Sequence, residues 1–182
     1  LQKHTKNMDY IINLAALIGI PYSYKAVKSY IDTNIIGTYN ILKVTQNNKI
    51  KKTIHTSTSE VYGGNHKKPI KEYHQNYAQS PYAASKIGAD QLCISFYCSF
   101  NCPVVIIRPF NTFGPRQSNR AIIPTIINQL ISSNKLNLGN VNTFRDLNYI
   151  DDTIEAYIKI LKSNKKINGE IFNVGSGFNF SI

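Results

Sequence analysis

A tyrosine and a lysine stand four residues apart in the segment Tyr82-Ala83-Ala84-Ser85-Lys86. In a helix this spacing places both side chains on one face, about 40° apart, so the Lys86 ammonium can sit beside the Tyr82 phenol. A helix start is indicated here, with Ser80 as N-cap and Pro81 as the first helical residue. The cation and the positive end of the helix dipole favour phenolate, which predicts a lowered pKa for Tyr82 and a role as general base. The alternative is an ordinary surface Tyr–Lys pair.

A second polar group, Ser57-Thr58-Ser59-Glu60-Val61-Tyr62-Gly63, follows a stretch of β character from Lys52 to Thr58. In open α/β sheets, ligands bind at the carboxyl ends of the strands. A carboxylate such as Glu60 at this edge costs free energy unless it has a partner or a task. Glu60 is therefore a candidate catalytic residue, with a helix-capping or loop role as the alternative.

Alternating strand and helix patterns predict how these groups are positioned. Strands are expected at Asp9–Ala16, Lys52–Thr58, Val104–Arg108 and Glu170–Val174, with shorter ones at Lys135–Leu138 and Thr143–Tyr149. Helices are expected at Ser23–Thr45, Pro81–Phe100, Arg120–Ser133 and Asp151–Lys162. Strand–helix–strand repeats favour right-handed βαβ units, and so a doubly wound α/β fold with a parallel sheet.

Composition excludes several classes of function. The chain has 182 residues, 42% of them apolar, and a net charge of +11. The best apolar stretch, Tyr10 to Ile20, is interrupted by Asn13 and is too short to span a membrane. The 17 Lys are scattered and the four Arg lie between positions 108 and 145, so we expect no nucleic-acid partner.

The cysteines and the first residues bear on compartment and completeness. Cys93 and Cys102 would face opposite sides of the predicted helix, so with Cys98 they make a poor metal site. We expect no metal, buried reduced thiols and a cytoplasmic protein. Residues 1–6 show neither a secretory signal nor an initiator Met, and the chain looks cut from something longer.

Seven blocks of sequence carry a family resemblance. They are Asn13–Ala16, Asn34–Thr38, Ser57–Gly63, Ser80–Lys86, Arg108–Arg116, Arg145–Asp152 and Phe172–Gly175. The chain resembles the extended short-chain dehydrogenases/reductases of the NAD-dependent epimerase/dehydratase family. The triplet Thr58-Ser59-Glu60 is more similar to 4,6-dehydratases and decarboxylases than to 4-epimerases. Ala15–Tyr24 and Gly114–Ser118 are most similar to bacterial N-acetylglucosamine-nucleotide 4,6-dehydratases.

The resemblance implies a reaction and a role for each residue. NAD removes a hydride from sugar C4, water leaves across C5 and C6, and the hydride returns to C6. Tyr82 would take the C4 hydroxyl proton, Lys86 would hold the nicotinamide ribose, and Thr58 would bind the C4 oxygen. Glu60 would remove the C5 proton. The acid for the C6 hydroxyl would be Glu60 itself or a water held by Ser59.

The same resemblance implies binding residues and partners. Cofactor contacts fall on Leu14, Ala15, Ala16, Asn34 and Ser57, beside Tyr82 and Lys86. Substrate contacts fall on Asn111, Arg116, Arg120 and Arg145. For Arg145 the alternative is a salt bridge with Asp146 or Asp151. The substrate would be a UDP- or GDP-N-acetylglucosamine.

Domain organisation also follows from the resemblance. Residues 1–114 would form the C-terminal part of a Rossmann-like NAD-binding domain. Residues 115–182 would be mostly substrate-binding, an incomplete part of a small α+β substrate domain, with about 150–175 returning to the first domain. The glycine-rich fingerprint and the N-terminal half of the sheet would precede Leu1, so we expect a fragment that binds NAD weakly.

A homodimer is implied through helices at 23–46 and 81–100, with Phe96, Tyr97 and Phe100 as apolar surface. An intramolecular core explains those side chains equally well. Two alternative functions stay open: an epimerase or decarboxylase on the same scaffold, and a non-catalytic Rossmann-like sensor.

Overall fold

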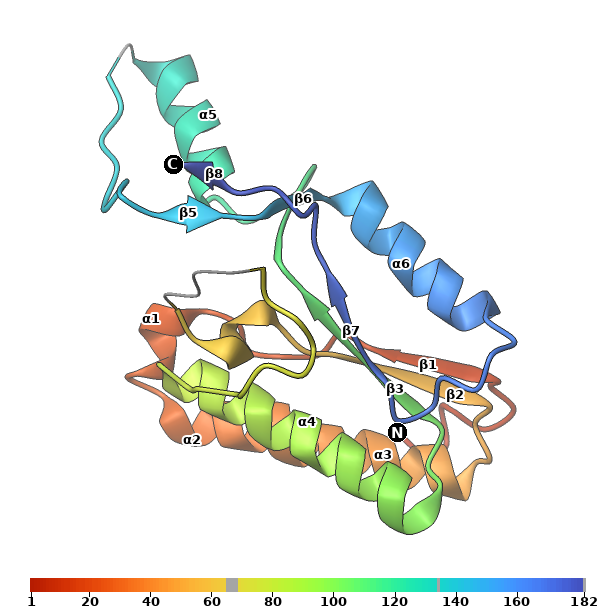
Figure 1. The fold of residues 1–182 in the computed structure, drawn as a ribbon. Helices are drawn as coiled ribbons and strands as arrows, with labels where there is room; N and C mark the ends of the chain where they lie inside the picture. Colours follow the sequence, from red (N-terminus) through yellow and green to blue (C-terminus); the bar gives the residue numbers. More distant parts are fainter. Residues whose placement is uncertain (65–68, 134, 182) are drawn as a thin grey trace.

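A four-stranded parallel sheet forms the centre of the chain in a computed structural model that describes residues 1–64, 69–133 and 135–181 (Figure 1). Its strand order is β1-β2-β3-β7, and all three pairings are parallel. The strands are β1 (Tyr10–Asn13), β2 (Lys52–Thr56), β3 (Val104–Pro109) and β7 (Ile171–Val174). The α/β class and the parallel sheet are thereby confirmed.

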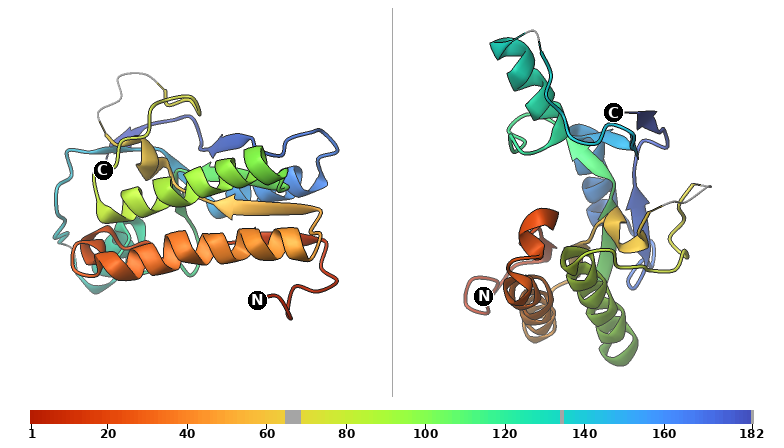
Figure 2. Two further views of the ribbon diagram at one scale, coloured as in Figure 1. Left: turned by 90° about the horizontal axis from the view of Figure 1, so that it is seen from below. Right: turned by 90° about the vertical axis from the view of Figure 1, so that its left-hand side faces the viewer.

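Helices cover both faces of this sheet. Helices α3 (Gly37–Asn47) and α4 (Pro81–Phe100) lie side by side on one face, and α6 (Ile150–Lys162) lies on the other (Figures 1 and 2). Successive side chains of a strand point to opposite faces. In β3, Val104 and Ile106 accordingly pack with residues of α3 and α4, while Val105 and Ile107 pack with residues of α6.

The long helix predicted over Ser23–Thr45 is not continuous. A short helix, α1 (Ile20–Ser23), comes first, and α2 (Val27–Tyr30) then leads through a π-helical segment, η1 (Ile31–Ile36), into α3. A π-helix shifts the register of the residues that face inward. Here the shift accompanies the burial of Asn34, which bonds to two other segments.

Strand β1 differs from the predicted strand in length and burial. It ends at Asn13 rather than Ala16 and lies at an edge of the sheet, with Tyr10 49% exposed and Ile12 41% exposed. Although β1 is mostly apolar, these side chains are exposed because, in the described sheet, β1 pairs on one side only, with β2.

Beyond β3 the chain forms a smaller layer of short elements. They are β4 (Asn111–Phe113), α5 (Ile122–Ser132), β5 (Phe144–Arg145), β6 (Leu147–Tyr149) and β8 (Phe180–Ser181). Strand β4 pairs in parallel with β6, and β5 pairs antiparallel with β8. Sequence patterns missed β4 and β8, because two- and three-residue strands depend on distant partners rather than on their own periodicity.

Two further expectations in this layer are corrected. The strand predicted at Thr143–Tyr149 is split at Asp146, whose carboxylate accepts hydrogen bonds from Ser176 and Gly177. The strand predicted at Lys135–Leu138 is absent from the described residues. There the Gln129 side chain takes the place of a β-ladder, since it both donates to and accepts from the backbone of Asn137.

Two observations concern the surface. No helix within the described ranges is long and apolar enough to cross a membrane. Cys93 and Cys102 are buried, as expected, but Cys98 is exposed on α4, so the prediction of buried thiols holds for two of the three.

Candidate active site

The start of helix α4 fixes the tyrosine and the lysine. Ser80 is the N-cap, and its hydroxyl accepts a hydrogen bond of 3.1 Å from the Ala83 amide, while Pro81 is the first helical residue. This confirms the predicted helix start. Tyr82 is 7% exposed and Lys86 is 2% exposed, so the pair lies inside the protein rather than on its surface.

The Lys86 ammonium donates a hydrogen bond of 2.6 Å to the carbonyl oxygen of Thr56, the last residue of β2. Burial raises the pKa of Tyr82 to about 12, a hydrogen bond with Thr58 lowers it, and the nearby charge of Glu60 raises it further. The lowered pKa predicted for Tyr82 is therefore wrong in this structure. The spacing of the pair is right, but desolvation of the phenol outweighs the effects that favour phenolate.

A short 3-10 helix, η2 (Ser59–Tyr62), carries the carboxylate. Thr58 is its N-cap, and the Thr58 hydroxyl accepts a hydrogen bond of 3.2 Å from the Glu60 amide. Because the Thr58 side chain is also hydrogen-bonded to Tyr82, one hydroxyl links the phenol to the turn that holds Glu60. The charge of Glu60 lies close enough to shift the pKa of Tyr82. The structure thus brings the predicted catalytic groups of two segments to one edge of the sheet.

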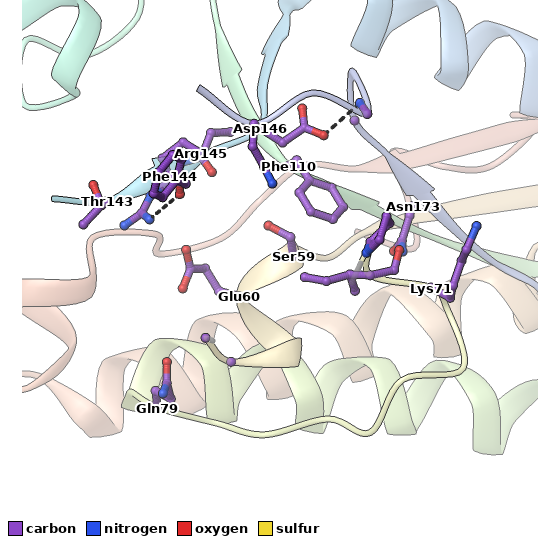
Figure 3. A pocket seen from close by; sticks show the side chains of 18 of the residues that line it. Ser59, Glu60, Lys71, Gln79, Phe110, Thr143, Phe144, Arg145, Asp146 and Asn173 are labelled. Atoms are coloured by element: carbon purple, nitrogen blue, oxygen red, sulfur yellow. Dashed lines mark hydrogen bonds between the residues drawn. The ribbon is translucent and has the colours of Figure 1, made fainter. Parts of the chain in front are cut away.

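A cavity of about 870 Å³ opens beside these groups (Figure 3). Ser59 and Glu60 line it from η2, Phe110 and Asn111 follow from the end of β3, and Arg145 lies on the opposite wall. Tyr82 and Lys86 are not among the residues that line it, and both are buried.

The predicted substrate-binding residues fall into two groups. Asn111 and Arg145 line the large cavity, and both also line a neighbouring one of about 270 Å³. Arg116 and Arg120 line neither; both are exposed on the segment between β4 and α5. Residues next to them in the chain, Gln117 and Ala121, do line the smaller cavity, and the predicted substrate contact of Arg116 and Arg120 stays a prediction.

Arg145 has no salt bridge with Asp146 or Asp151 in the part of the chain that the structure describes. Its guanidinium donates a hydrogen bond of 2.8 Å to the carbonyl oxygen of Phe144, and the residue is exposed. Asp146 is instead engaged with Ser176, accepting from its amide at 2.8 Å and from its hydroxyl at 2.7 Å. The arginine fork is left available to a ligand.

Several cavity residues were not found from the sequence. They include Lys71, Gln79, Phe110 and Asn173. Asn173 lies near the carboxyl end of β7, so the rule that located Glu60 would also have located it. Lys71 and Gln79 lie in an irregular stretch whose path no periodicity predicts.

On the cofactor side, the loop after β1 presents Leu14 and Ala15 to solvent and Ala16 partly so. Asn34 is 1% exposed and holds this loop from beneath: its amide oxygen accepts from the Leu17 amide at 2.9 Å, and its nitrogen donates to the Leu17 carbonyl at 3.0 Å. Asn34 thus positions this loop, and its predicted contact with the cofactor stays a prediction.

Ser57 also forms a hydrogen bond inside the protein, and its predicted cofactor contact stays a prediction. Its side chain is 5% exposed and donates a hydrogen bond of 2.9 Å to the buried carboxylate of Asp90. Within the described ranges, no group of three His, Cys, Asp or Glu side chains is placed to hold a metal ion.

Comparison with known proteins assigns the chain to a family. The sequence profile described as GDP-mannose 4,6 dehydratase matches residues 2–182. The chain belongs to this family. It is also 35% identical over 188 aligned positions to a dTDP-D-glucose 4,6-dehydratase of Dictyostelium discoideum, an alignment that takes in 97% of this chain and 43% of that protein.

Solved structures of the same fold are similar over the whole chain. A UDP-glucuronic acid 4-epimerase from Bacillus cereus, in complex with UDP-glucuronic acid and NAD, gives a TM-score of 0.93 at 33% identity and covers 100% of this chain and 58% of its own. A dTDP-glucose 4,6-dehydratase from Streptomyces venezuelae with NAD bound gives a TM-score of 0.92 at 27% identity and covers 99% of this chain and 56% of its own. The chain spans about half the length of the curated relatives it matches.

Proposed function

We propose that the protein carrying this chain is a nucleotide-sugar 4,6-dehydratase that uses NAD. The observation that carries the proposal is the link through Thr58, whose side chain is hydrogen-bonded to Tyr82 and caps the turn that bears Glu60. A 4,6-dehydration needs a base for a sugar hydroxyl and a second base for the neighbouring carbon. Membership of the family supports the same reading.

The cofactor site would lie along the carboxyl edge of the sheet, between the exposed loop at Leu14–Ala16 and Lys86. The fit rests on this loop, which Asn34 holds open to solvent, and on Lys86, whose three-donor ammonium gives one hydrogen bond to Thr56. Bound NAD would supply the acceptor for the C4 hydride and the positive charge of its oxidised ring, which lowers the pKa of a neighbouring phenol.

The residues of this chain would move the protons. Tyr82 accepts the proton of the C4 hydroxyl, and Thr58 holds the same oxygen. The 4-keto group then makes the C5 proton acidic, and Glu60, whose side chain reaches the cavity, removes it. The C6 hydroxyl leaves as water after protonation by Glu60 or by a water molecule that Ser59 holds.

The nucleotide diphosphate would be held by Asn111 and Arg145. An arginine fork binds phosphate oxygens in pairs, and this guanidinium is exposed at the cavity wall. For the sugar we propose N-acetylglucosamine, linked to UDP or GDP, because Ala15–Tyr24 and Gly114–Ser118 resemble dehydratases of that specificity.

The test is a product analysis with UDP- and GDP-N-acetylglucosamine. We expect a product lighter by one water, and Glu60→Gln should abolish its formation while the fold is retained. The exposed Glu155→Gln on α6 serves as the matched control. If neither nucleotide sugar loses water, the dehydratase proposal fails.

An epimerase is the second candidate, because the structure in complex with UDP-glucuronic acid and NAD is a 4-epimerase. The same incubation separates the two functions. A product of unchanged mass with inverted C4 would favour epimerisation, in which Glu60 has no proton to remove at C5.

We also propose a cytoplasmic homodimer. Ile36 and Tyr39 on the outer helical layer are 48% and 41% exposed, and Phe100 on α4 is 58% exposed. Phe96, in contrast, is 7% exposed and belongs to the core between α4 and the sheet, so it is not available to a partner. Light scattering of the protein tests this, and a monomer would contradict it.

A further inference from the structure

A buried chain of polar side chains runs from helix α4 to the turn that carries Glu60. Asp90, one helical turn beyond Lys86, has a fully buried side chain. Its carboxylate oxygen Oδ2 accepts a hydrogen bond of 3.0 Å from Nε of Arg108 and lies 2.9 Å from Nη2 of the same guanidinium in an ion pair. Arg108 is 1% exposed, and the family resemblance implies no role for this residue itself.

Arg108 also contacts Tyr62. Its Nη1 atom donates a hydrogen bond of 2.8 Å to the Tyr62 hydroxyl. Its guanidinium carbon lies 4.8 Å from the centre of the Tyr62 ring. The planar fork makes this possible, because one face of the guanidinium binds a carboxylate while another N–H reaches a second acceptor. Tyr62 is the last residue of η2, two positions after Glu60.

The connection ends at the cavity wall. The Tyr62 hydroxyl donates 2.8 Å to the side-chain oxygen of Asn173 on β7. The backbone N–H of Asn173 donates a hydrogen bond of 2.9 Å to the Glu72 carboxylate. The side-chain nitrogen of Asn173 donates one of 3.3 Å to the carbonyl oxygen of Ile70. Ile70, Glu72 and Asn173 all line the cavity.

We propose that Tyr62 is a positioning residue that, between Arg108 and Asn173, fixes the turn bearing Glu60 relative to Tyr82 on α4. The inference rests on the proposed function, in which Tyr82 serves the oxidation and Glu60 serves the elimination. The two groups lie on separate elements, so a fixed distance between them needs a rigid link. Thr58 supplies one link at the start of η2, and Tyr62 supplies the other at its end.

The test uses Tyr62→Phe in the protein that carries this chain, with nucleotide sugar as substrate and reduced nicotinamide followed by its absorbance in a single turnover. Phe keeps the ring and removes only the hydroxyl. We expect the oxidation to proceed at nearly the wild-type rate and the elimination to slow roughly tenfold, so that reduced cofactor accumulates. A merely structural residue would slow both phases alike.

Two further variants sharpen the result. Arg108→Lys keeps the positive charge opposite Asp90 but loses the planar guanidinium that reaches Tyr62. It should therefore also slow the elimination more than the oxidation. Thr53→Val is the matched control: it removes another buried hydroxyl, bonded at 2.7 Å to Thr45 near the start of β2, and should leave both phases unchanged.

Hydrogen–deuterium exchange provides a readout that does not depend on turnover. In Tyr62→Phe, amides in residues 59–63 and 70–77 should exchange faster, while those of helix α4 keep their protection. Equal loss in both kinetic phases, or exchange that is unchanged or raised uniformly, overturns the proposal. If the wild type releases no water from any nucleotide sugar, the proposed function fails, and the exchange data still decide whether Tyr62 holds the turn.

Discussion

The Nζ atom of Lys86 lies 2.6 Å from the carbonyl oxygen of Thr56 and donates a hydrogen bond to it. This bond ties the helix that carries Tyr82 to the strand end from which Thr58 and Glu60 follow. Burial lowers the pKa of Lys86, and the charge of Asp90 opposes that shift. Lys86 therefore links the two segments of the site, and it does so in a buried position that disfavours the charged form of its ammonium.

Replacing this lysine should separate activity from stability. Lys86→Met keeps most of the side-chain volume and removes the buried ammonium. We expect turnover to fall by about a hundredfold or more. The free energy of unfolding should change by less than about 1 kcal/mol, because the lost hydrogen bond is offset by the lost desolvation penalty. Denaturant unfolding and product assays measure the two effects.

The exposed Lys159→Met on α6 is the control, and it should alter neither quantity, since Lys159 forms an exposed surface ion pair with Glu155. Unchanged turnover in Lys86→Met would contradict the assigned role of Lys86.

Tyr82→Phe removes the group assigned to the C4 hydroxyl proton. We expect no reduced cofactor to form in a single turnover and steady-state turnover to fall by roughly 10²–10⁴-fold. Tyr157→Phe is the matched control, because it also loses a buried hydroxyl, one bonded to Thr56 at 2.7 Å on the other face of the sheet. A normal rate in Tyr82→Phe would remove that tyrosine from the mechanism.

The raised pKa of Tyr82 predicts a loss of stability in alkali. Because the pKa moves from 10.0 to about 12 on folding, the folded chain holds a proton that the unfolded chain releases between these values. Stability is therefore unaffected below about pH 10 and falls as the pH rises toward about 12, by up to ~3 kcal/mol from this group. Urea unfolding at about pH 9 and about pH 11.5 measures the change.

Tyr82→Phe should lack this part of the alkaline loss. An equal fall in wild type and variant would show that ionisation of Tyr82 is not its cause.

The sequence located the catalytic segments because local rules govern them. Ser80 and Pro81 start α4, and Asn101 ends it in the left-handed conformation, with φ of 53°, that such a cap requires. The rule that ligands meet the carboxyl ends of parallel strands placed Glu60 on the correct edge. Each of these signals needs only neighbouring residues or the direction of a strand.

The missed features depend on what surrounds each residue. The predicted direction of the Tyr82 pKa shift was wrong because burial, which spacing does not reveal, raises the pKa by more than the hydrogen bond with Thr58 lowers it. The hydrogen bonds of the Asn34 side chain to Leu17 and Ser85 depend on the π-helical segment, which the sequence pattern does not reveal. Arg116 does not line the large cavity, and which residues do so depends on the fold of the whole segment.

Asp90 should be the most consequential charge in the fold. Burial raises its pKa, but the neighbouring His55 side chain and the charge of Arg108 lower it overall. Asp90→Asn leaves the buried Arg108 guanidinium without its counter-charge, and we expect the free energy of unfolding near neutral pH to fall by about 3–5 kcal/mol. The surface change Glu155→Gln, in an exposed pair with Lys159, should stay within about 0.5 kcal/mol.

The pH dependence tests the cause of this effect. Since the folded pKa of Asp90 lies below its ordinary value of 3.8, the stabilisation is present above that pH and is lost as the pH falls through the folded pKa. The difference between wild type and Asp90→Asn should therefore shrink in strong acid. Urea unfolding at about pH 7 and about pH 3 measures it, and a difference that does not change with pH would mean that the carboxylate charge is not what stabilises this cluster.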